Sequence, residues 1–258
     1  MALSNEPIKE GKYIYCIIDS NATQVFESPG IGGRGDKVYN ICYKDISAVI
    51  SNSPIKKYPI SSENTYAHEK AIEDAMKEYT VLPVRFCTIA ENEEKIKKIL
   101  EKGCDKFKPL LTKMKNKKEL GLKALFKQDI IYNDILEKYK DIKKLKDSLV
   151  SKSFQSTYYE RIELGKMVEL ALEKEKEIYK EEIINTLSPL SLDFRVNTPY
   201  GERMIVNAAF LIETDREPEF DSHLNELADK YGDKVKFKYV GTLPPFNFVN
   251  LIIELEKY

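Results

Sequence analysis

The sequence lacks the long apolar segments that place a protein in or across a membrane. No apolar run in its 258 residues approaches the roughly 20 residues needed to cross a bilayer. The first residues, MALSNEPIKEGK, also lack the basic and then apolar regions of a secretion signal. We therefore expect a cytoplasmic protein with no membrane partner.

Groups that bind metals or form redox centres are scarce. Histidine occurs only at His68 and His223, and neither has a carboxylate pair nearby at helical ligand spacing. The cysteines are far apart and match no zinc or redox spacing; they are Cys16, Cys42, Cys87 and Cys104. We expect reduced thiols, no metal site and no cofactor.

An excess of charge of one sign is also missing. The chain has 41 basic and 42 acidic side chains, which leaves a net charge of −1. A net charge so close to zero gives no global field that would attract nucleic acid or an anionic membrane. From the global charge we therefore expect no nucleic-acid partner.

The motif GIGGRG, Gly30 to Gly35, matches the G-x-G-x-x-G pattern that can bind dinucleotide phosphates. That chemistry requires a strand that ends at the glycines and a helix that begins there. Here strand-like residues follow the glycines instead, in DKVYNICY and KDISAVISNS. We interpret the glycines as a turn leading into a hairpin, and we expect no role for the embedded RGD in a cytosolic chain.

Alternation and periodicity predict the other elements of the first half. A strand is expected at Lys12–Ile18. A helix capped by Ser62 or Asn64 would present one apolar face, made by His68, Ile72, Ala75, Met76 and Tyr79. A strand interrupted by Pro83 follows at Thr80–Ile89, and a second helix, NEEKIKKILEKG, is expected to end at Gly103.

The second half begins with the predicted strand KELGLKALF, Lys118 to Phe126. Two apolar patterns with helical spacing, Ile131 to Leu149 and Leu164 to Ile183, then suit a helical hairpin. Beyond Pro189 the chain reads as strand, strand, helix and strand, in the segments LSLDFRVN, MIVNAAFLIE, FDSHLNELADKYG and KVKFKYVGTLPPFNFVNLIIEL.

This order of elements predicts an α+β fold with two ferredoxin-like domains in tandem, since each half approximates β-α-β-β-α-β. Helical periodicity stops between Gly103 and Asn116, where Pro109 interrupts it. We therefore predict an N-terminal modified ferredoxin-like domain at 1–110 and a C-terminal one at 111–258, with the long helical hairpin inserted in the second.

His68 and Cys87 are the residues that most invite a catalytic interpretation. A thiol and an imidazole on neighbouring elements can form a nucleophile and base pair. However, His68 occupies the apolar stripe of its helix, and buried cysteine is common. No feature argues for a lowered thiol pKa, so we predict no catalytic residue and a hydrogen-bonded core or interface histidine.

Arg85 is placed in a predicted strand, where a buried guanidinium would need an acceptor. Glu69 and Glu73, on the preceding helix, are the expected partners. We therefore predict a structural ion pair for Arg85.

The segment Lys95 to Lys118 contains ten lysines against Glu101 and Asp105. Such a stretch could contact phosphates. Its only aromatic residue is Phe107, whereas ferredoxin-like RNA-binding sheets stack bases on strand aromatics. We favour a solvated helix and linker, and RNA binding stays an alternative function.

The segment VGTLPPFNFVN, Val240 to Asn250, combines paired prolines with aromatics. Pro244 and Pro245 should bend a strand and set Phe246 and Phe248 on alternate or exposed positions. Two interpretations stay open: a bulged core strand, or an exposed surface that binds a partner.

Three segments resemble motifs of the gas vesicle F and L proteins, and the resemblance spans nearly the whole chain. YTVLPVRFCTI is similar to LPxRFGT, KELGLKALF to VELGVKV, and VGTLPPFNF to TGPWPPYNF. The HE pair at His68 and Glu69 also fits. This chain has Cys87 where the family usually has glycine, and it lacks the tryptophan before the prolines.

The resemblance implies an accessory protein of gas vesicles, with two ferredoxin-related domains and the small hydrophobic shell protein as its partner. Other gas vesicle accessory proteins are possible further partners. The residues implied in structure or partner binding are His68, Glu69, Arg85, Pro244, Pro245, Phe246 and Phe248. We expect a non-enzymatic protein that shields shell subunits before or during wall assembly.

Overall fold

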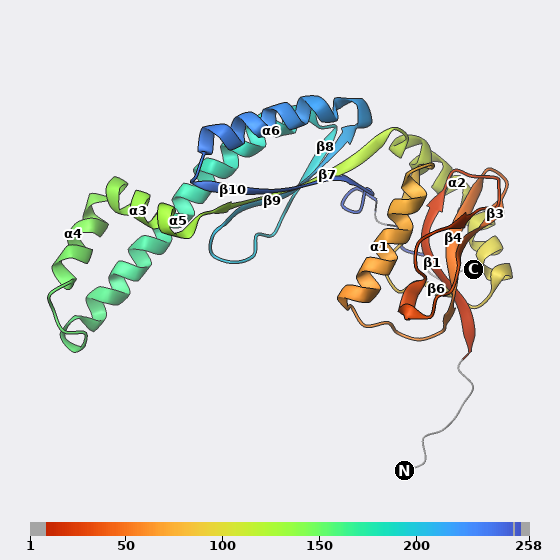
Figure 1. Ribbon diagram of the computed structural model, residues 1–258, viewed down its shortest axis with the longest axis horizontal. Coiled ribbons are helices and arrows are strands. Elements are labelled where there is room, and N and C mark those ends of the chain that lie inside the picture. Colours follow the sequence, from red (N-terminus) through yellow and green to blue (C-terminus); the bar gives the residue numbers. More distant parts are fainter. Residues whose placement is uncertain (1–8, 250, 254–258) are drawn as a thin grey trace, which may run out of the picture. The chain divides into compact units, whose positions relative to one another are not determined.

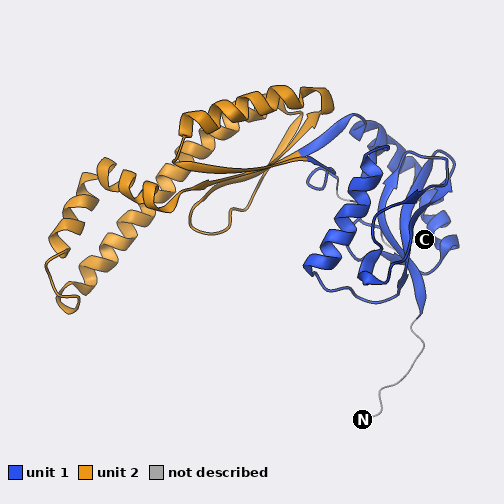
Figure 2. Ribbon diagram, viewed as in Figure 1, with its two compact units in different colours: residues 1–119, 242–258 blue, residues 120–241 orange. Residues whose placement is uncertain are grey.

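The computed structural model describes residues 9–249 and 251–253, and the chain divides into two compact units (Figure 2). Unit 1 comprises Met1–Glu119 and Thr242–Tyr258, and unit 2 comprises Leu120–Gly241. The first eight residues, Asn250 and the last five residues, on which parts of the sequence interpretation rest, lie outside the described residues.

Unit 1 has an antiparallel sheet with the strand order β2-β3-β4-β1-β5, and β6 also pairs with β1. The helices α1 and α2 cover the two sides of the sheet, and β1 is therefore buried on both faces (Figure 1). The elements are β1 (Glu10–Ile18), β2 (Val25–Phe26), η1 (Ile31–Gly33), β3 (Val38–Tyr43), β4 (Ile46–Pro54), α1 (Ser62–Met76), β5 (Val81–Pro83), β6 (Ile89–Ala90), α2 (Glu93–Met114) and the start of β7 (Lys117–Phe126).

Unit 2 has a sheet with the order β10-β7-β9-β8, in which β8 and β9 are antiparallel. Alternate residues of β7 are buried against the helices, and the strand itself lies where the sequence predicts one. The elements are α3 (Gln128–Lys138), α4 (Lys140–Leu149), η2 (Gln155–Thr157), α5 (Tyr158–Leu187), η3 (Ser188–Leu190), β8 (Asp193–Asn197), β9 (Met204–Glu213), η4 (Thr214–Arg216), α6 (Glu217–Tyr231) and β10 (Val235–Leu243).

The fold is therefore mixed α and β with antiparallel sheets, as the sequence predicts. No helix in the described part of the chain is long and apolar enough to cross a bilayer.

The second helix is longer than predicted, because α2 continues through both Gly103 and Pro109. A Cβ atom on Gly103 would lie 2.3 Å from the Phe107 ring, so the glycine makes room for a buried aromatic side chain and does not end the helix. Pro109 is exposed, where water can satisfy the carbonyl that loses its helical hydrogen bond.

The boundaries of the two units differ from those of the predicted domains at 1–110 and 111–258. Unit 1 continues to Glu119, and the segment from Thr242 onward returns to it. Such a return is a long-range contact, which local periodicity does not report.

The first of the two predicted hairpin helices is broken at Tyr139, which separates α3 from α4 with a ψ of 90°. Glu175 of α5 is buried, and its Oε1 accepts hydrogen bonds from the Tyr139 hydroxyl at 2.7 Å and from Lys138 Nζ at 2.6 Å. The break thus lets two donors reach a buried carboxylate, which would otherwise be costly.

Candidate functional site

A buried aromatic cluster lies between β1 and α1 in unit 1. The rings of Tyr13, Tyr15 and His68 contact one another, with centroids 4.9 to 5.8 Å apart. Tyr58 and Phe86 pack edge-on against Tyr13. The α1 helix that carries His68 is capped by Ser61, whose hydroxyl accepts from the Asn64 N–H, rather than by Ser62 or Asn64.

The Tyr13 hydroxyl connects α1 to the segment after β5. It accepts a hydrogen bond from the Cys87 N–H at 2.9 Å and lies 3.1 Å from His68 Nδ1. The hydrogen bond with the Val84 backbone favours the protonated ring, so the ring donates in that bond; the neutral ring then keeps its proton on Nε2 and accepts from the Tyr13 hydroxyl at Nδ1. Burial lowers the pKa of His68 to about 4, against the opposing effect of a hydrogen bond with the Val84 backbone.

The buried His68 should make stability fall at acidic pH. Between its ordinary pKa of 6.5 and about 4, the unfolded chain takes up a proton that the folded chain excludes. The free energy of unfolding should therefore be lower at pH 5 than at pH 7, by about 2 kcal/mol from this residue.

The measurement is chemical denaturation across this pH range for the wild type and for His68→Gln. Glu69 and Glu119, whose pKa values are raised by burial, act in the opposite direction, so the difference between the two curves isolates His68. Parallel curves would contradict the assignment.

Arg85 and Glu69 are exposed, so the predicted structural ion pair is wrong. In the described chain Arg85 has no ion pair with Glu69 or Glu73. Its backbone carbonyl accepts from the Thr88 hydroxyl at 2.6 Å. The expected strand Thr80–Ile89 is instead two short strands, β5 and β6, joined by a turn that displays the guanidinium to solvent.

The C-terminal segment is a turn and not a bent strand. β10 ends at Leu243, Pro244 and Pro245 are buried, and the Pro245 carbonyl accepts from the N–H groups of Phe248 and Val249. A proline cannot donate to a sheet, which explains why the strand ends here. The segment is therefore not the bulged core strand of the first interpretation, and the second, an exposed surface that binds a partner, stays a prediction.

Two contacts hold this segment in unit 1. Buried Glu119 of β7 accepts from the Asn247 backbone N–H at 2.8 Å and from its side-chain amide at 2.5 Å. Further on, Leu251 forms a parallel bridge with Val84, and the Arg85 N–H donates to the Leu251 carbonyl at 3.4 Å. Glu119 and Asn247 belong to two of the segments that carry the family resemblance.

Together α1, the segment after β5 and the C-terminal segment enclose an open pocket of about 310 Å³ in unit 1, called here the α1 pocket. Four predicted site residues line it: His68, Glu69, Arg85 and Phe246. Pro244, Pro245 and Phe248 do not. Sequence reasoning missed the other lining residues, which are Ile60, Thr65, Pro83, Val84, Phe86, Val249 and Leu251.

The lining of the α1 pocket is mainly apolar, with charged groups on exposed positions. Ile60 is 88% exposed, which is unusual for a large apolar side chain beside further apolar groups. Phe246 is partly buried and packs against the core of unit 1. The arrangement fits an apolar ligand with polar or charged groups at its edge.

Cys87 and His68 do not form a nucleophile and base pair. The Cys87 sulfur accepts from the Tyr58 N–H at 3.3 Å and lies 3.8 Å from the Lys56 carbonyl, and the Tyr13 hydroxyl occupies His68 Nδ1. In the described residues, no group of three or more His, Cys, Asp or Glu side chains could hold a metal ion.

Cys87 has a φ of +65°, in the left-handed region that glycine adopts without strain. Cys87→Gly should therefore leave the free energy of unfolding unchanged or raise it by up to about 1 kcal/mol, whereas Cys87→Val should lower it by about 1–3 kcal/mol. Cys87→Ala controls for loss of the sulfur. Urea denaturation checks this, and a valine variant as stable as the glycine variant would contradict it.

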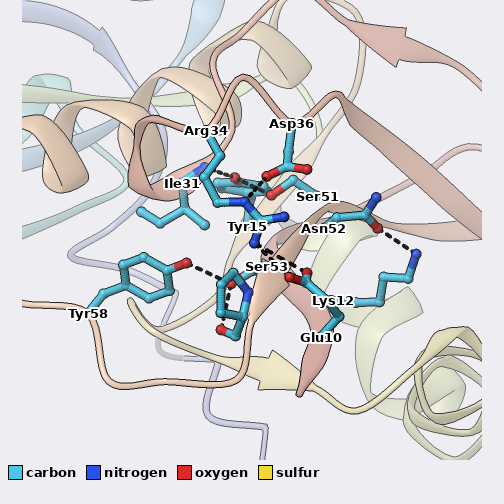
Figure 3. A network of polar contacts seen from close by, with 11 residues as sticks. Glu10, Lys12, Tyr15, Ile31, Arg34, Asp36, Ser51, Asn52, Ser53 and Tyr58 are labelled. Carbon is cyan, nitrogen blue, oxygen red and sulfur yellow. Dashed lines mark hydrogen bonds and ion pairs between the residues drawn. The ribbon is translucent and has the colours of Figure 1, made fainter. Parts of the chain in front are cut away.

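The glycine motif forms a turn before the β3–β4 hairpin, as interpreted from the sequence (Figure 3). The Ile31 N–H donates to the Tyr15 hydroxyl at 2.8 Å. Arg34 of the RGD contacts Glu10 at 2.9 Å and Asp36 at 3.1 Å, so the arginine is engaged within its own unit. No helix begins at these glycines other than η1, a single short turn.

The basic segment Lys95–Lys118 is mainly the α2 helix, followed by the first residues of β7. Its one aromatic residue, Phe107, is buried in the core. Lys108 pairs with Asp45 at 2.5 Å, and Lys118 is buried. No exposed aromatic in this segment is available for stacking on bases.

Comparison with known proteins decides the family. The family model described as gas vesicle synthesis protein GvpL/GvpF matches residues 11–250. The chain belongs to this family. Membership implies a role in gas vesicle assembly for this chain. Two of the three segments that resemble family motifs, together with the HE pair, contribute residues to the α1 pocket.

Individual relatives match over nearly their full length. Gas vesicle protein F of Dolichospermum flosaquae is 26% identical, and the match covers 93% of this chain and 97% of that protein. The crystal structure of GvpF from an Anabaena species is similar in fold, with a TM-score of 0.77, 24% identity and coverage of 94% and 99%. GvpF from Microcystis aeruginosa gives a TM-score of 0.72 at 23% identity, with coverage of 93% and 99%.

Proposed function

We propose that this GvpL/GvpF protein is a non-enzymatic assembly factor that binds the small hydrophobic shell protein of gas vesicles through its α1 pocket. It would act in the cytoplasm at the growing vesicle, where it shields the apolar surface of shell subunits before or during wall assembly. The supporting observation is the pocket itself, whose apolar lining includes the exposed Ile60 and whose exposed charged residues are Glu69 and Arg85.

The architecture supports a protein of this kind. We propose that unit 2 is ferredoxin-like, because its strands and helices follow the β-α-β-β-α-β order, and that unit 1 is a modified version. Such sheets present no catalytic group by themselves, and function then depends on the surface. Other gas vesicle accessory proteins are further proposed partners, and neither nucleic acid nor a membrane is one.

A pull-down of the shell protein tests the proposal. Ile60→Asp places a charge in the pocket without disturbing the core, because Ile60 is 88% exposed. Val25→Asp is the matched control, an exposed apolar residue of β2 in the same unit that does not line the pocket. Wild type and control should retain the shell protein and Ile60→Asp should lose it; equal retention by all three would reject the pocket.

RNA binding is the alternative function, and a salt titration distinguishes it. Binding through lysines on α2 should weaken steeply with salt, whereas apolar burial in the pocket should not. The buried Phe107 gives no support to this alternative. The RNA-binding alternative would be supported if the wild type retains RNA and the variant with Lys97 and Lys98 replaced by Glu does not.

A further inference from the structure

The end of α4, the loop after it and the first turns of α5 in unit 2 carry a group of exposed apolar and aromatic side chains, called here the aromatic tip. Its members are 41 to 81% exposed: Val150, Phe154, Tyr158, Tyr159 and Ile162. The rings are contiguous, since Tyr158 contacts Phe154 at 6.3 Å and Tyr159 at 5.5 Å between centroids. An exposed contiguous apolar group of this size on a folded unit usually marks a binding surface.

Gly165 lies within the same helix, which spans 30 residues. Glycine is unfavourable in a helix interior, and a Cβ atom at Gly165 would meet no heavy atom within 4 Å. Gly103, by contrast, is required by the neighbouring Phe107 ring. The fold of the chain itself therefore gives no packing reason for Gly165, whereas close approach of another helix would give one.

Gly165 also borders an acidic pocket of about 320 Å³ in unit 2. Its floor includes Val168 and Leu172, and Glu169, Glu173 and Glu202 surround it. Glu173 pairs with Lys176, whereas Glu169 and Glu202 are exposed and have no ion pair in the described chain.

The stretch around the aromatic tip carries an excess of positive charge, with Lys140, Lys143, Lys144, Lys146, Lys152 and Arg161 against Asp141, Asp147, Glu160 and Glu163. Arg161 lies over the Phe154 ring, 5.5 Å from its centroid. The neighbouring lysines are exposed and make no ion pair with described residues; they are Lys140, Lys143, Lys144, Lys146 and Lys152. Along α5, Tyr158, Tyr159 and Arg161 lie before Gly165, next in sequence to the lysines of α4 and its following loop, and Val168, Glu169, Leu172 and Glu173 of the acidic pocket lie after it.

We propose that two copies of this chain associate through α5, antiparallel, about a twofold axis at Gly165, with the aromatic tip of each copy in the acidic pocket of the other. Tyr158 and Leu172 are equally far from Gly165, about 10 Å along the helix, so each tyrosine meets the pocket floor of the second copy. Arg161 and Glu169 are also equally far from it, so the opposite charges pair. One surface serves both copies, as a twofold interface requires.

Disulfide trapping tests the axis directly, with the full chain. Gly165→Cys places two thiols on the axis, within the Cα separation of about 4.4–6.8 Å that a disulfide requires. The matched control is the exposed Glu181→Cys, about 24 Å from the axis along the helix. Under mild oxidation we expect a covalent dimer of Gly165→Cys and only background cross-linking of Glu181→Cys. Equal cross-linking of the two variants would overturn the proposal. So would a chain that dimerises in solution while Gly165→Cys forms no covalent dimer.

Sedimentation velocity gives the second test, from about 1 to about 300 μM, where small interfaces associate. Gly165→Leu fills the space that the second helix needs and should weaken association at least tenfold. In the monomer it should raise the melting temperature by about 2–4 °C, because leucine favours helix. Glu169→Lys should also weaken association. A wild type that stays monomeric throughout, or a Gly165→Leu variant that associates as well as wild type, would overturn the proposal.

Discussion

Tyr13→Phe is expected to lower the free energy of unfolding by about 2–5 kcal/mol, although it removes a single oxygen atom. The hydroxyl accepts from the Cys87 N–H and donates to His68 Nδ1 in a fully buried site. Its loss leaves the buried His68 Nδ1 and the half-buried Cys87 N–H without a partner. A buried group left unpaired costs about 1–3 kcal/mol, and the half-buried N–H costs less. The same variant should loosen the turn that displays Arg85.

Urea denaturation measures this effect. Tyr66→Phe is the matched control, because Tyr66 lies on α1 and is 61% exposed; surface changes of this kind stay within about 0.5 kcal/mol. A Tyr13→Phe variant as stable as the control would mean that the hydroxyl does not connect α1 to the segment after β5.

Phe246→Ala should lower the free energy of unfolding by about 2–3 kcal/mol, whereas Arg85→Ala should change it by less than about 0.5 kcal/mol. Phe246 packs against the core of unit 1, and Arg85 is exposed without an ion pair in the described chain. This reverses the roles that the sequence suggested for the two residues. Melting curves check it, and an early-melting Arg85→Ala variant would restore the structural ion pair.

Alternation, helical periodicity and turn residues correctly predicted several individual strands, helices and turns. The strand β7, the apolar face of α1 and the hairpin after the glycine turn all appear in the structure where the sequence indicates. Four of the residues that the family resemblance pointed to line the α1 pocket, and their role stays a prediction.

The errors come from contacts that are distant in sequence. Gly103 and Pro109 are typical of a helix end, but the burial of Phe107 and Leu111 keeps α2 intact. Nothing local reveals that Asn247 reaches Glu119, so the C-terminal segment was assigned to the wrong unit. Arg85 was expected to form an ion pair because a strand was assumed where the chain turns at Cys87.

Cys87 shows how a departure from the family pattern gains meaning only with the structure. The motif that this segment resembles, LPxRFGT, has glycine at this position, and the positive φ of Cys87 is a conformation that glycine adopts without strain. The chain retains the turn with a residue that strains it, because the Tyr13 hydroxyl and the Tyr58 N–H hold the Cys87 backbone and sulfur in place.

The affinity of Arg85→Ala for the gas vesicle shell protein tests the central claim most directly. Arg85 lines the α1 pocket and is exposed, so its loss should weaken shell-protein binding by about 1–2 kcal/mol, roughly five- to thirtyfold in Kd, at unchanged melting temperature. Arg216→Ala, a partly exposed arginine of unit 2 paired with Glu219, should bind as wild type does. Equal affinity of wild type and both variants would contradict the assignment of binding to the α1 pocket.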